Sequence, residues 1–352
     1  MRAVVARNKQ LVVDEVDDPV PGPGEALVAV RACGICGSDL HALKFADEMV
    51  AQGREAGLPQ FFDPALDYVM GHEFCCEVLD LGPGCDGAPV QAGDLVTSLP
   101  VMLNANGIEP VGAYSNLYNG GYAERMRLTA GLCLKVPNGL DARRAACTEP
   151  MAVGRHAVGK ADIAPRDTAL VLGCGPVGLA VIAELRRRNV DTIVAADYWP
   201  SRRAVATAMG ASDVVDPAAE PAIEAWRRVT GGMQPLVQFE AIGVPGVLDR
   251  AMKDAPPQSR IVVVGVCMQP DHVHPFVGIS KELRVQFVLA YDPFEFGDTL
   301  RAIAEGEIDV APLLTGACGL DGVAGAFTAL GDPEQHVKVM VEPQRSGAVA
   351  PL

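Results

Sequence analysis

The sequence predicts an α/β protein in which a mainly β N-terminal half precedes a doubly wound parallel sheet. Two sequence patterns along the chain predict this. Up to about residue 150, short apolar runs are separated by Gly, Pro and Asp, as in β-strands joined by turns. From Asp167 onward, continuous apolar runs alternate with amphipathic segments, as in parallel strands covered by helices on both faces.

The expected elements follow in order along the chain. In the first half we expect strands at residues 11–16, 25–32, 73–82 and 94–101. In the second half we expect strands within 168–172, 191–199, 236–243, 260–266 and 282–291, and helices within 180–189, 200–211 and 247–253. A helix at 296–306, a loop at 309–316, a helix at 323–331 and a strand at 336–343 follow, and the tail from Gln344 to Leu352 is expected to be disordered.

Composition restricts the class of protein and its partners. The 352 residues predict two domains, and 29 Lys and Arg against 44 Asp and Glu give a net charge of −15, which argues against a nucleic acid or an anionic membrane as partner. The longest apolar run, Ala169 to Leu185, is interrupted by glycines and cannot span a bilayer. The N-terminus lacks the features of a signal peptide, so we expect a cytoplasmic protein whose ten cysteines are reduced.

A glycine-rich turn in the second half predicts a dinucleotide site. The segment Gly173-Cys174-Gly175-Pro176-Val177-Gly178 joins an expected strand directly to an expected helix. Glycines at these positions allow a tight turn and close approach of the backbone to a pyrophosphate. Asp197 lies 19 residues after Gly178, at the end of the next strand, where a carboxylate can bind the ribose hydroxyls of NAD and would repel the 2′-phosphate of NADP. Arg202 and Arg203 leave a 2′-phosphate as an alternative, because arginine binds phosphate; as surface charges of a helix they are also placed to contact the adenosine.

The first half carries residues that are chemically suited to bind zinc. Cys36, His72 and Glu149 would supply a thiolate, an imidazole and a carboxylate, and three protein ligands leave a fourth position for water or substrate. These residues are 36 and 77 positions apart, so they form no local motif and a shared metal is one interpretation of them.

The runs ACGICGSDLH, GHE, GDLV, GGYAE and TEP, followed by G-x-G-x-x-G, closely resemble the zinc-dependent medium-chain dehydrogenases, the alcohol and polyol dehydrogenase family. The resemblance covers essentially the whole chain in the right order. It implies a GroES-like catalytic domain over residues 1–153, a Rossmann NAD-binding domain over 154–290, and a C-terminal segment, 291–352, that returns to the catalytic domain. It also implies hydride transfer between NAD(H) and a small-molecule alcohol, primary or secondary, or its aldehyde or ketone.

The resemblance assigns roles to individual residues. Cys36, His72 and Glu149 match the family's catalytic zinc ligands, and Glu73 matches a nearby carboxylate that binds the metal directly or through water. Many members also hold a structural zinc with four cysteines in a lobe between GDLV and GGYAE. The corresponding segment here, Thr97 to Gly120, contains no cysteine, so we expect one catalytic Zn²⁺ per chain and no structural zinc.

Three further residues match the family near the metal. Asp39 matches the residue that orients the histidine ligand. Ser38 and His41 match the hydroxyl and the imidazole that pass the substrate proton to solvent. The chemistry is reasonable on its own terms, since zinc lowers the pKa of a bound alcohol and histidine titrates near neutral pH.

Several alternatives stay open at this point. Cys33 and Cys36 form C-x-x-C, which is also typical of a redox pair or of half a zinc knuckle. Cys147 competes with Glu149 as the third ligand. The chain could instead be a zinc-independent medium-chain reductase of activated C=C bonds, or a non-catalytic nucleotide-binding sensor; the Cys36, His72 and Glu149 set argues against the first of these.

Three structural expectations complete the analysis. The strand at 282–291 lies where family members pair sheet edges across a two-fold axis, so a homodimer or homotetramer is implied. The long connection from Lys44 to Met70 is either part of the substrate pocket wall or a surface loop; its aromatic residues are Phe45, Phe61, Phe62 and Tyr68. The cysteine-free lobe is expected to be held by ordinary packing of Tyr114, Leu117 and Tyr118.

Overall fold

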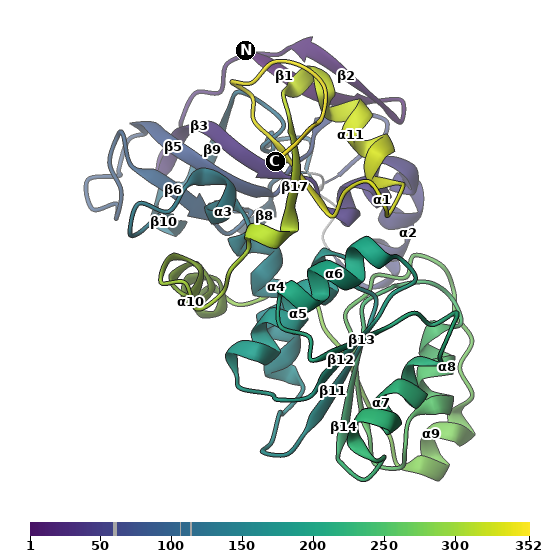
Figure 1. Cartoon of the computed structure of the whole chain (residues 1–352). Helices are drawn as coiled ribbons and strands as arrows, with labels where there is room; N and C mark the ends of the chain where they lie inside the picture. The colour runs from purple at the N-terminus through teal and green to yellow at the C-terminus, as the bar shows by residue number, and fades with distance from the viewer. Residues whose placement is uncertain (59–61, 106, 113–114) are drawn as a thin grey trace. The chain divides into compact units, whose positions relative to one another are not determined.

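A computed structural model describes residues 1–58, 62–105, 107–112 and 115–352, which divide into two compact units. Unit 1 contains residues 1–149, 303–305 and 314–352, and unit 2 contains residues 150–302 and 306–313. The C-terminal part of the chain therefore folds with the N-terminal part. Figure 1 shows this as yellow elements lying among the purple and blue ones.

Unit 1 is built on mostly antiparallel strands around one apolar core, and β17 and β18 pair in parallel. A three-stranded sheet has the order β2-β1-β4, and an eight-stranded sheet has the order β10-β6-β5-β3-β18-β17-β19 with β9 also paired to β3. The strands are β1 (Arg2–Arg7), β2 (Gln10–Glu15), β3 (Glu25–Gly34), β4 (Tyr68–Val69), β5 (Glu73–Leu81), β6 (Leu95–Ser98), β7 (Val101–Asn104), β8 (Gly107–Pro110), β9 (Arg125–Thr129), β10 (Cys133–Lys135), β17 (Leu314–Cys318), β18 (Lys338–Val341) and β19 (Ala350–Pro351). The helices are α1 (Gly37–Lys44), α2 (Ala46–Glu55), α3 (Ala142–Ala146) and α11 (Val323–Leu330).

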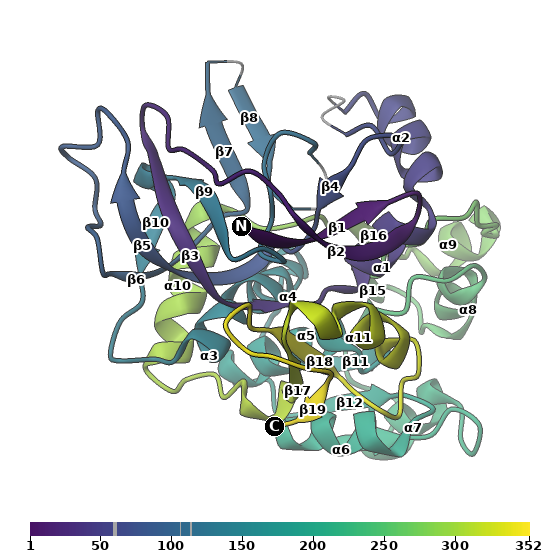
Figure 2. The same cartoon turned by 90° about the horizontal axis from the view of Figure 1, so that it is seen from above.

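The C-terminal tail is ordered, so our expectation of a disordered 344–352 segment was wrong. β19 pairs antiparallel with β17, where Ala317 faces Ala350, and the Gln344 side-chain amide donates to the Arg31 carbonyl at 2.8 Å. Figure 2 shows β17, β18 and β19 together next to the C-terminus. The free edge of β17 accounts for this order, because it offers backbone partners that the composition of a tail does not reveal.

The cysteine-free lobe contains the β7–β8 hairpin, which Figure 2 shows extending from the unit. Tyr118 packs as expected: it lies against the core, accepts a hydrogen bond from Asn104, and stacks under the Arg127 guanidinium at 4.9 Å. Leu117 was wrongly expected to pack, because 67% of it is exposed. Tyr114 lies outside the described residues.

The connection from Lys44 to Met70 contains a helix, α2, that we did not expect. Its aromatic residues include Tyr68, which is buried, donates its hydroxyl to the Ala42 carbonyl at 3.3 Å, and meets Phe62 edge to face at 4.7 Å. These two rings therefore pack locally, as the surface-loop interpretation predicts. Phe61 lies outside the described residues.

Unit 2 is a parallel six-stranded sheet with the order β13-β12-β11-β14-β15-β16. This is the strand order of a dinucleotide-binding Rossmann fold. The strands are β11 (Thr168–Leu172), β12 (Ile193–Ala196), β13 (Asp213–Val215), β14 (Leu236–Glu240), β15 (Arg260–Val263) and β16 (Arg284–Phe287). The helices are α4 (Thr148–Lys160), α5 (Pro176–Arg187), α6 (Pro200–Ala208), α7 (Ala222–Thr230), α8 (Val247–Asp254), α9 (Pro275–Lys281) and α10 (Pro293–Ala304).

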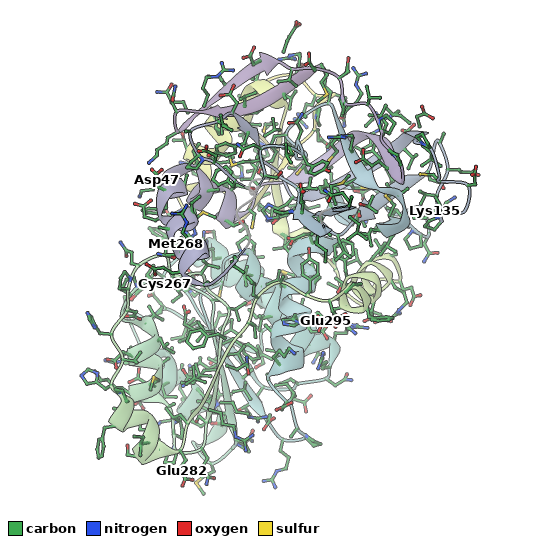
Figure 3. All side chains as sticks on the ribbon, turned by 180° about the vertical axis from the view of Figure 1, so that it is seen from behind. Asp47, Lys135, Cys267, Met268, Glu282 and Glu295 are labelled. Atoms are coloured by element: carbon green, nitrogen blue, oxygen red, sulfur yellow. The ribbon has the colours of Figure 1, made fainter. Side chains whose placement is uncertain are left out.

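Charged side chains tie the helices of unit 2 together. Arg155 of α4 contacts Asp298 of α10 at 2.5 Å, and the buried Glu184 of α5 contacts Arg155 at 3.6 Å. His156 lies 2.7 Å from Glu295, which is labelled on α10 in Figure 3. His156 is therefore a packed residue, as expected for a histidine with no ligand partners.

Candidate active site

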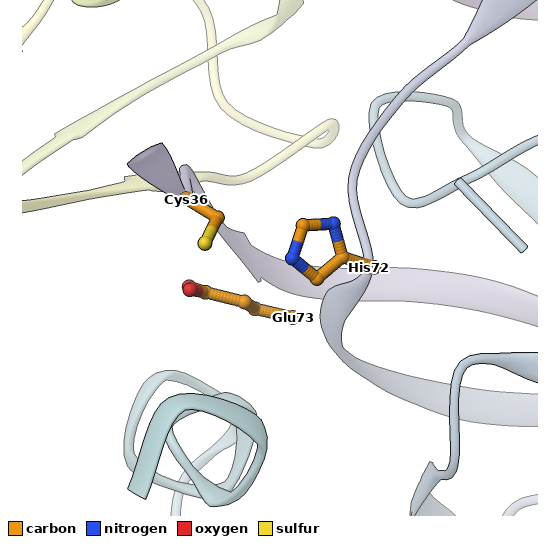
Figure 4. A group of neighbouring side chains, drawn as sticks. All are labelled: Cys36, His72 and Glu73. Atoms are coloured by element: carbon orange, nitrogen blue, oxygen red, sulfur yellow. The ribbon is translucent and has the colours of Figure 1, made fainter. Parts of the chain in front are cut away.

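Three potential metal ligands meet in unit 1. Cys36 precedes α1, His72 precedes β5, and Glu73 is the first residue of β5. One ligand atom from each of these side chains lies within 4.8 Å of the others, and Figure 4 shows the thiol, the ring and the carboxylate turned toward a common point. His72 and Glu73 are buried, while Cys36 is partly exposed. A thiolate, an imidazole and a carboxylate at this spacing are suited to a tetrahedral zinc ion.

The pairing of β3 with β5 explains why these residues meet. Gly34 at the end of β3 is the partner of Glu73, so the chain leaving β3 toward Cys36 passes beside the start of β5. A Cβ at Gly34 would lie 2.0 Å from a carboxylate oxygen of Glu73, so only glycine fits. Gly71 has a φ of +101°, a left-handed conformation that glycine adopts without strain, and it turns the chain into His72.

Asp39 supports the histidine from behind. His72 Nδ1 lies 3.3 Å from Asp39 Oδ1, while Asp39 Oδ2 accepts hydrogen bonds from the Tyr122 hydroxyl at 2.6 Å and the Cys36 amide at 3.0 Å. A carboxylate on Nδ1 fixes the tautomer that leaves Nε2 for a metal. Burial disfavours the imidazolium, but the Asp39 charge and Cys36 outweigh it and raise the pKa of His72 well above its usual value.

The two predicted proton-transfer residues lie on α1. Ser38 Oγ is 3.4 Å from His72 Nε2, so the hydroxyl lies beside the three potential ligands. His41 is half-buried, and its Nδ1 is inaccessible and has no hydrogen-bond partner among the described residues. Burial and the Lys44 charge lower the pKa of His41, so the ring is neutral near pH 7 and can accept a proton.

A buried lysine that sequence reasoning missed completes the cluster. Lys338 on β18 is 1% exposed, and its Nζ donates to both carboxylate oxygens of Glu73, at 2.6 and 2.7 Å, and to the Ile35 carbonyl at 3.1 Å. Burial alone would lower the pKa of Lys338, but the Glu73 charge outweighs it and raises it. The available signal was a single lysine in the otherwise apolar run VKVMV.

The third predicted ligand is not part of this cluster. Glu149 is buried at the second position of α4, and Cys147 is buried two residues before it. Neither residue forms a close group with Cys36 and His72 among the described residues. Burial raises the pKa of the Cys147 thiol to about 12, which disfavours the thiolate that binds metal. Glu149 and Cys147 thus remain the competing predictions for the third ligand.

The glycine-rich turn has the geometry that the sequence predicts. Gly173 follows β11 with a φ of +93°, and Gly175 caps α5, whose first residue is Pro176. A Cβ at Gly178 would lie 1.9 Å from the Gly173 carbonyl oxygen, so Gly178 allows the helix to approach the turn. Val177 lies in the first turn of α5, whose free amides are suited to bind a phosphate.

Asp197 closes one end of this turn. Its carboxylate accepts hydrogen bonds from the Cys174 amide at 2.8 Å and the Trp199 amide at 2.9 Å, which hold it beside the glycines. The two neighbouring arginines differ. Arg203 donates to the Asp197 and Tyr198 carbonyls at 2.7 Å each, whereas Arg202 lines the cavity and its buried Nε has no hydrogen-bond partner among the described residues. Arg202 is therefore the arginine available to a ligand.

Comparisons with known proteins agree with both units. Residues 22–138 match the alcohol dehydrogenase GroES-like domain, and residues 176–305 match the zinc-binding dehydrogenase domain. The chain is 30% identical over 345 residues to an (R,R)-butanediol dehydrogenase of Bacillus subtilis, covering 95% of this chain and 97% of that protein. The chain belongs to the zinc-type medium-chain alcohol and polyol dehydrogenase family.

Solved structures show the same architecture. The crystal structure of 2R,3R-butanediol dehydrogenase from Bacillus subtilis has a TM-score of 0.81 and 29% identity, covering 97% of this chain and 99% of that one. A putative zinc-binding dehydrogenase from Sinorhizobium meliloti 1021, bound to NADP, has a TM-score of 0.82 and 26% identity, covering 97% and 99%. The predicted family, fold class and oxidoreductase activity are confirmed. Among the described residues, no helix is long and apolar enough to cross a membrane.

Proposed function

We propose that this dehydrogenase interconverts a small secondary alcohol or diol and its ketone, with one zinc ion held in unit 1 and NAD(H) bound to unit 2. The observation that carries the proposal is the cluster of the partly exposed Cys36 with the buried His72 and Glu73, and with Asp39 behind the histidine. The donor set, its burial and the carboxylate on Nδ1 all fit zinc. The name of the Bacillus butanediol dehydrogenase supports a diol or secondary alcohol as substrate.

The residues around the cluster have separate roles in the proposed reaction. When bound, zinc would polarise the alcohol oxygen as a Lewis acid and the nicotinamide would accept the hydride. Cys36 and His72 would hold the ion, with Glu149 or Glu73 as the acidic ligand. Asp39 keeps the imidazole of His72 in the tautomer that presents Nε2.

The proton of the alcohol needs a separate route to solvent. Ser38 Oγ lies at the cluster, 3.4 Å from His72 Nε2, and is placed to take the proton of the hydroxyl. His41 lies three residues further along α1, and its half-buried, neutral ring can receive that proton. The lowered pKa of His41 suits this role, because the ring is then neutral and ready to accept at neutral pH.

NAD is the cofactor that the second unit favours. Gly173 and Gly175 line the cavity and leave the backbone open to a pyrophosphate, while Gly178 lets the helix pack against the turn. Asp197 at the edge of the same cavity can accept from both ribose hydroxyls, and its charge would repel a 2′-phosphate. Arg202 lines the same cavity and would favour NADP instead, because its charge attracts a phosphate. The Sinorhizobium relative is bound to NADP. We give the Asp197 carboxylate more weight in the choice of NAD over NADP, because it can accept hydrogen bonds from both ribose hydroxyls of NAD.

We also propose that the chain forms a homodimer in the cytoplasm. All four residues of β16 are exposed at the edge of the parallel sheet, including Phe287 at 64%, and Phe276 and Leu289, which precede and follow the strand, are 77% and 78% exposed. An apolar edge strand of this kind is a liability unless a second copy covers it. All ten cysteines are free, which suits a reducing compartment.

Metal analysis combined with alcohol oxidation tests the central proposal. We expect one zinc per chain in the purified protein and reduction of NAD with butane-2,3-diol or another secondary alcohol. Cys36→Ser should lose both metal and activity, whereas the control Cys267→Ser, in a half-buried loop of unit 2, should keep both. The zinc content of Glu149→Gln and Cys147→Ser identifies the third ligand, because the variant that lacks this ligand should lose zinc. Full activity of zinc-free protein would contradict the proposal.

A further inference from the structure

The cavity beside the glycine-rich turn continues over one face of the parallel sheet. It has a volume of about 640 Å³ and is lined by residues of β11, β12 and β14 and by helices α7 and α8. Leu170 of β11 faces Gln238 of β14 in the register of the sheet, and Leu172 faces Glu240. Side chains at paired positions point to the same face, so Leu170, Leu172 and Gln238 form neighbouring parts of the cavity floor.

Gln238 is the polar member of this floor, and the charged residues Arg202, Arg250 and Asp254 also line the cavity. Gln238 is 1% exposed, and within the described part of the chain its side chain makes one hydrogen bond, from Nε2 to the Ala251 carbonyl at 3.4 Å. A glutamine amide has two N–H donors and an oxygen acceptor, so this bond leaves one N–H and the oxygen unused. These unused groups adjoin the cavity, where a ligand can supply their partners.

The order of subsites along the cavity indicates which part of a dinucleotide reaches Gln238. The pyrophosphate belongs at Gly173 and Gly175, and the ribose belongs at Asp197. The base attached to that ribose then enters the remaining part of the cavity, whose lining includes Ile223 and Ile242. These apolar side chains suit the faces of a purine ring, and only the edge of the ring can use the amide of Gln238.

We propose that Gln238 selects adenine by its edge and makes the enzyme discriminate NAD from its hypoxanthine analogue. Adenine presents an amino donor beside a ring nitrogen acceptor, and a glutamine amide presents the complementary acceptor and donor. Hypoxanthine carries an oxygen in place of the amino group, so its edge would require the amide to turn over. The bond to Ala251 opposes this, because turning over would bring Gln238 Oε1 against a carbonyl oxygen. This inference rests on the proposed binding of NAD to unit 2.

Titration calorimetry with NAD and nicotinamide hypoxanthine dinucleotide tests the inference on the whole protein without any need for an alcohol. We expect the wild type to bind NAD about tenfold more tightly, the effect of one or two buried hydrogen bonds lost and left unpaired. Gln238→Leu, which has similar volume and no hydrogen-bonding group, should reduce the ratio to about one, chiefly by weakening NAD binding. The control Ile223→Val trims the apolar wall of the same cavity and should keep the full ratio.

The wild-type ratio does not depend on whether a variant folds, and a thermal unfolding scan of each variant checks its integrity. Equal affinity of the wild type for both dinucleotides would overturn the inference, and so would an unchanged ratio in Gln238→Leu. Discrimination by binding without oxidation of any alcohol would support Gln238 while refuting the proposed reaction. Oxidation of alcohols with equal use of both dinucleotides would support the proposed reaction and refute the role of Gln238.

Discussion

Replacing Lys338 by methionine should destabilise unit 1 strongly. Lys338 and Glu73 are each 1% exposed, and the ammonium makes contacts of 2.6 and 2.7 Å to the carboxylate and 3.1 Å to the Ile35 carbonyl. Methionine keeps the length of the side chain but leaves Glu73 as a buried charge without its cation. Breaking a buried pair from one side costs about 3–5 kcal/mol. The raised pKa of Lys338 keeps the ammonium of the wild-type pair charged throughout the neutral range.

Urea unfolding of the chelator-treated protein measures this effect, since a bound metal would compensate for the Glu73 charge. The matched control is Lys135→Met, which breaks the 2.5 Å contact between Lys135, labelled in Figure 3, and Asp94. The Lys135 side chain is 60% exposed, so its loss should cost about 1 kcal/mol or less. A second substitution, Glu73→Gln, should restore most of the stability lost in Lys338→Met. The reasoning fails if Lys338→Met costs no more than Lys135→Met, or if the double variant is no more stable than the single one.

Three further predictions concern the site itself. Asp39→Asn should weaken zinc binding by about 10–100-fold by removing the carboxylate behind His72, measured by competition with a chelator; unchanged affinity would contradict the role of Asp39. Lys44→Met should raise the pKa of His41 by removing a nearby positive charge, so the acid limb of kcat/KM against pH should move to higher pH, and a shift to lower pH would exclude this assignment. Asp197→Ser should raise kcat/KM with NADP relative to NAD by about tenfold or more, and a fixed ratio would show that Asp197 does not choose the cofactor.

The fold of unit 2 was largely predictable because its strands are buried on both faces. β11, β12, β14 and β15 are almost wholly buried and read as continuous apolar runs. β13 was not predicted, since it has three residues and two of them are only partly buried. α7 was also missed, although Pro221 precedes it and Gly231 ends it in a left-handed conformation, which are usable signals for a helix.

The candidate site was predictable only where residues match a family pattern. Cys36, His72 and Glu73 were named from the sequence, and the structure brings them together. Physical reasoning alone could not pair them, because β3 and β5 are joined by a long connection and their register depends on the sheet. The contact of Lys338 with Glu73 could not be predicted for the same reason: the two residues are 265 positions apart, and no local pattern relates them.

Lys338 and Gln238 share a signal that a sequence does offer. Each is a polar residue inside a short, largely apolar strand, KVMV in β18 and LVQFE in β14, where Glu240 is a second polar residue, and each is 1% exposed in the structure. A strand that is buried on both faces accepts such a residue only at a cost, unless a specific partner uses its hydrogen bonds or its charge. For Lys338 that partner is Glu73, at the metal cluster. For Gln238 the protein supplies only the Ala251 carbonyl, and the remaining groups line the dinucleotide cavity. Glu73 is the partner that accounts for the buried Lys338. By the same argument, we infer that a bound dinucleotide supplies the missing partner of Gln238.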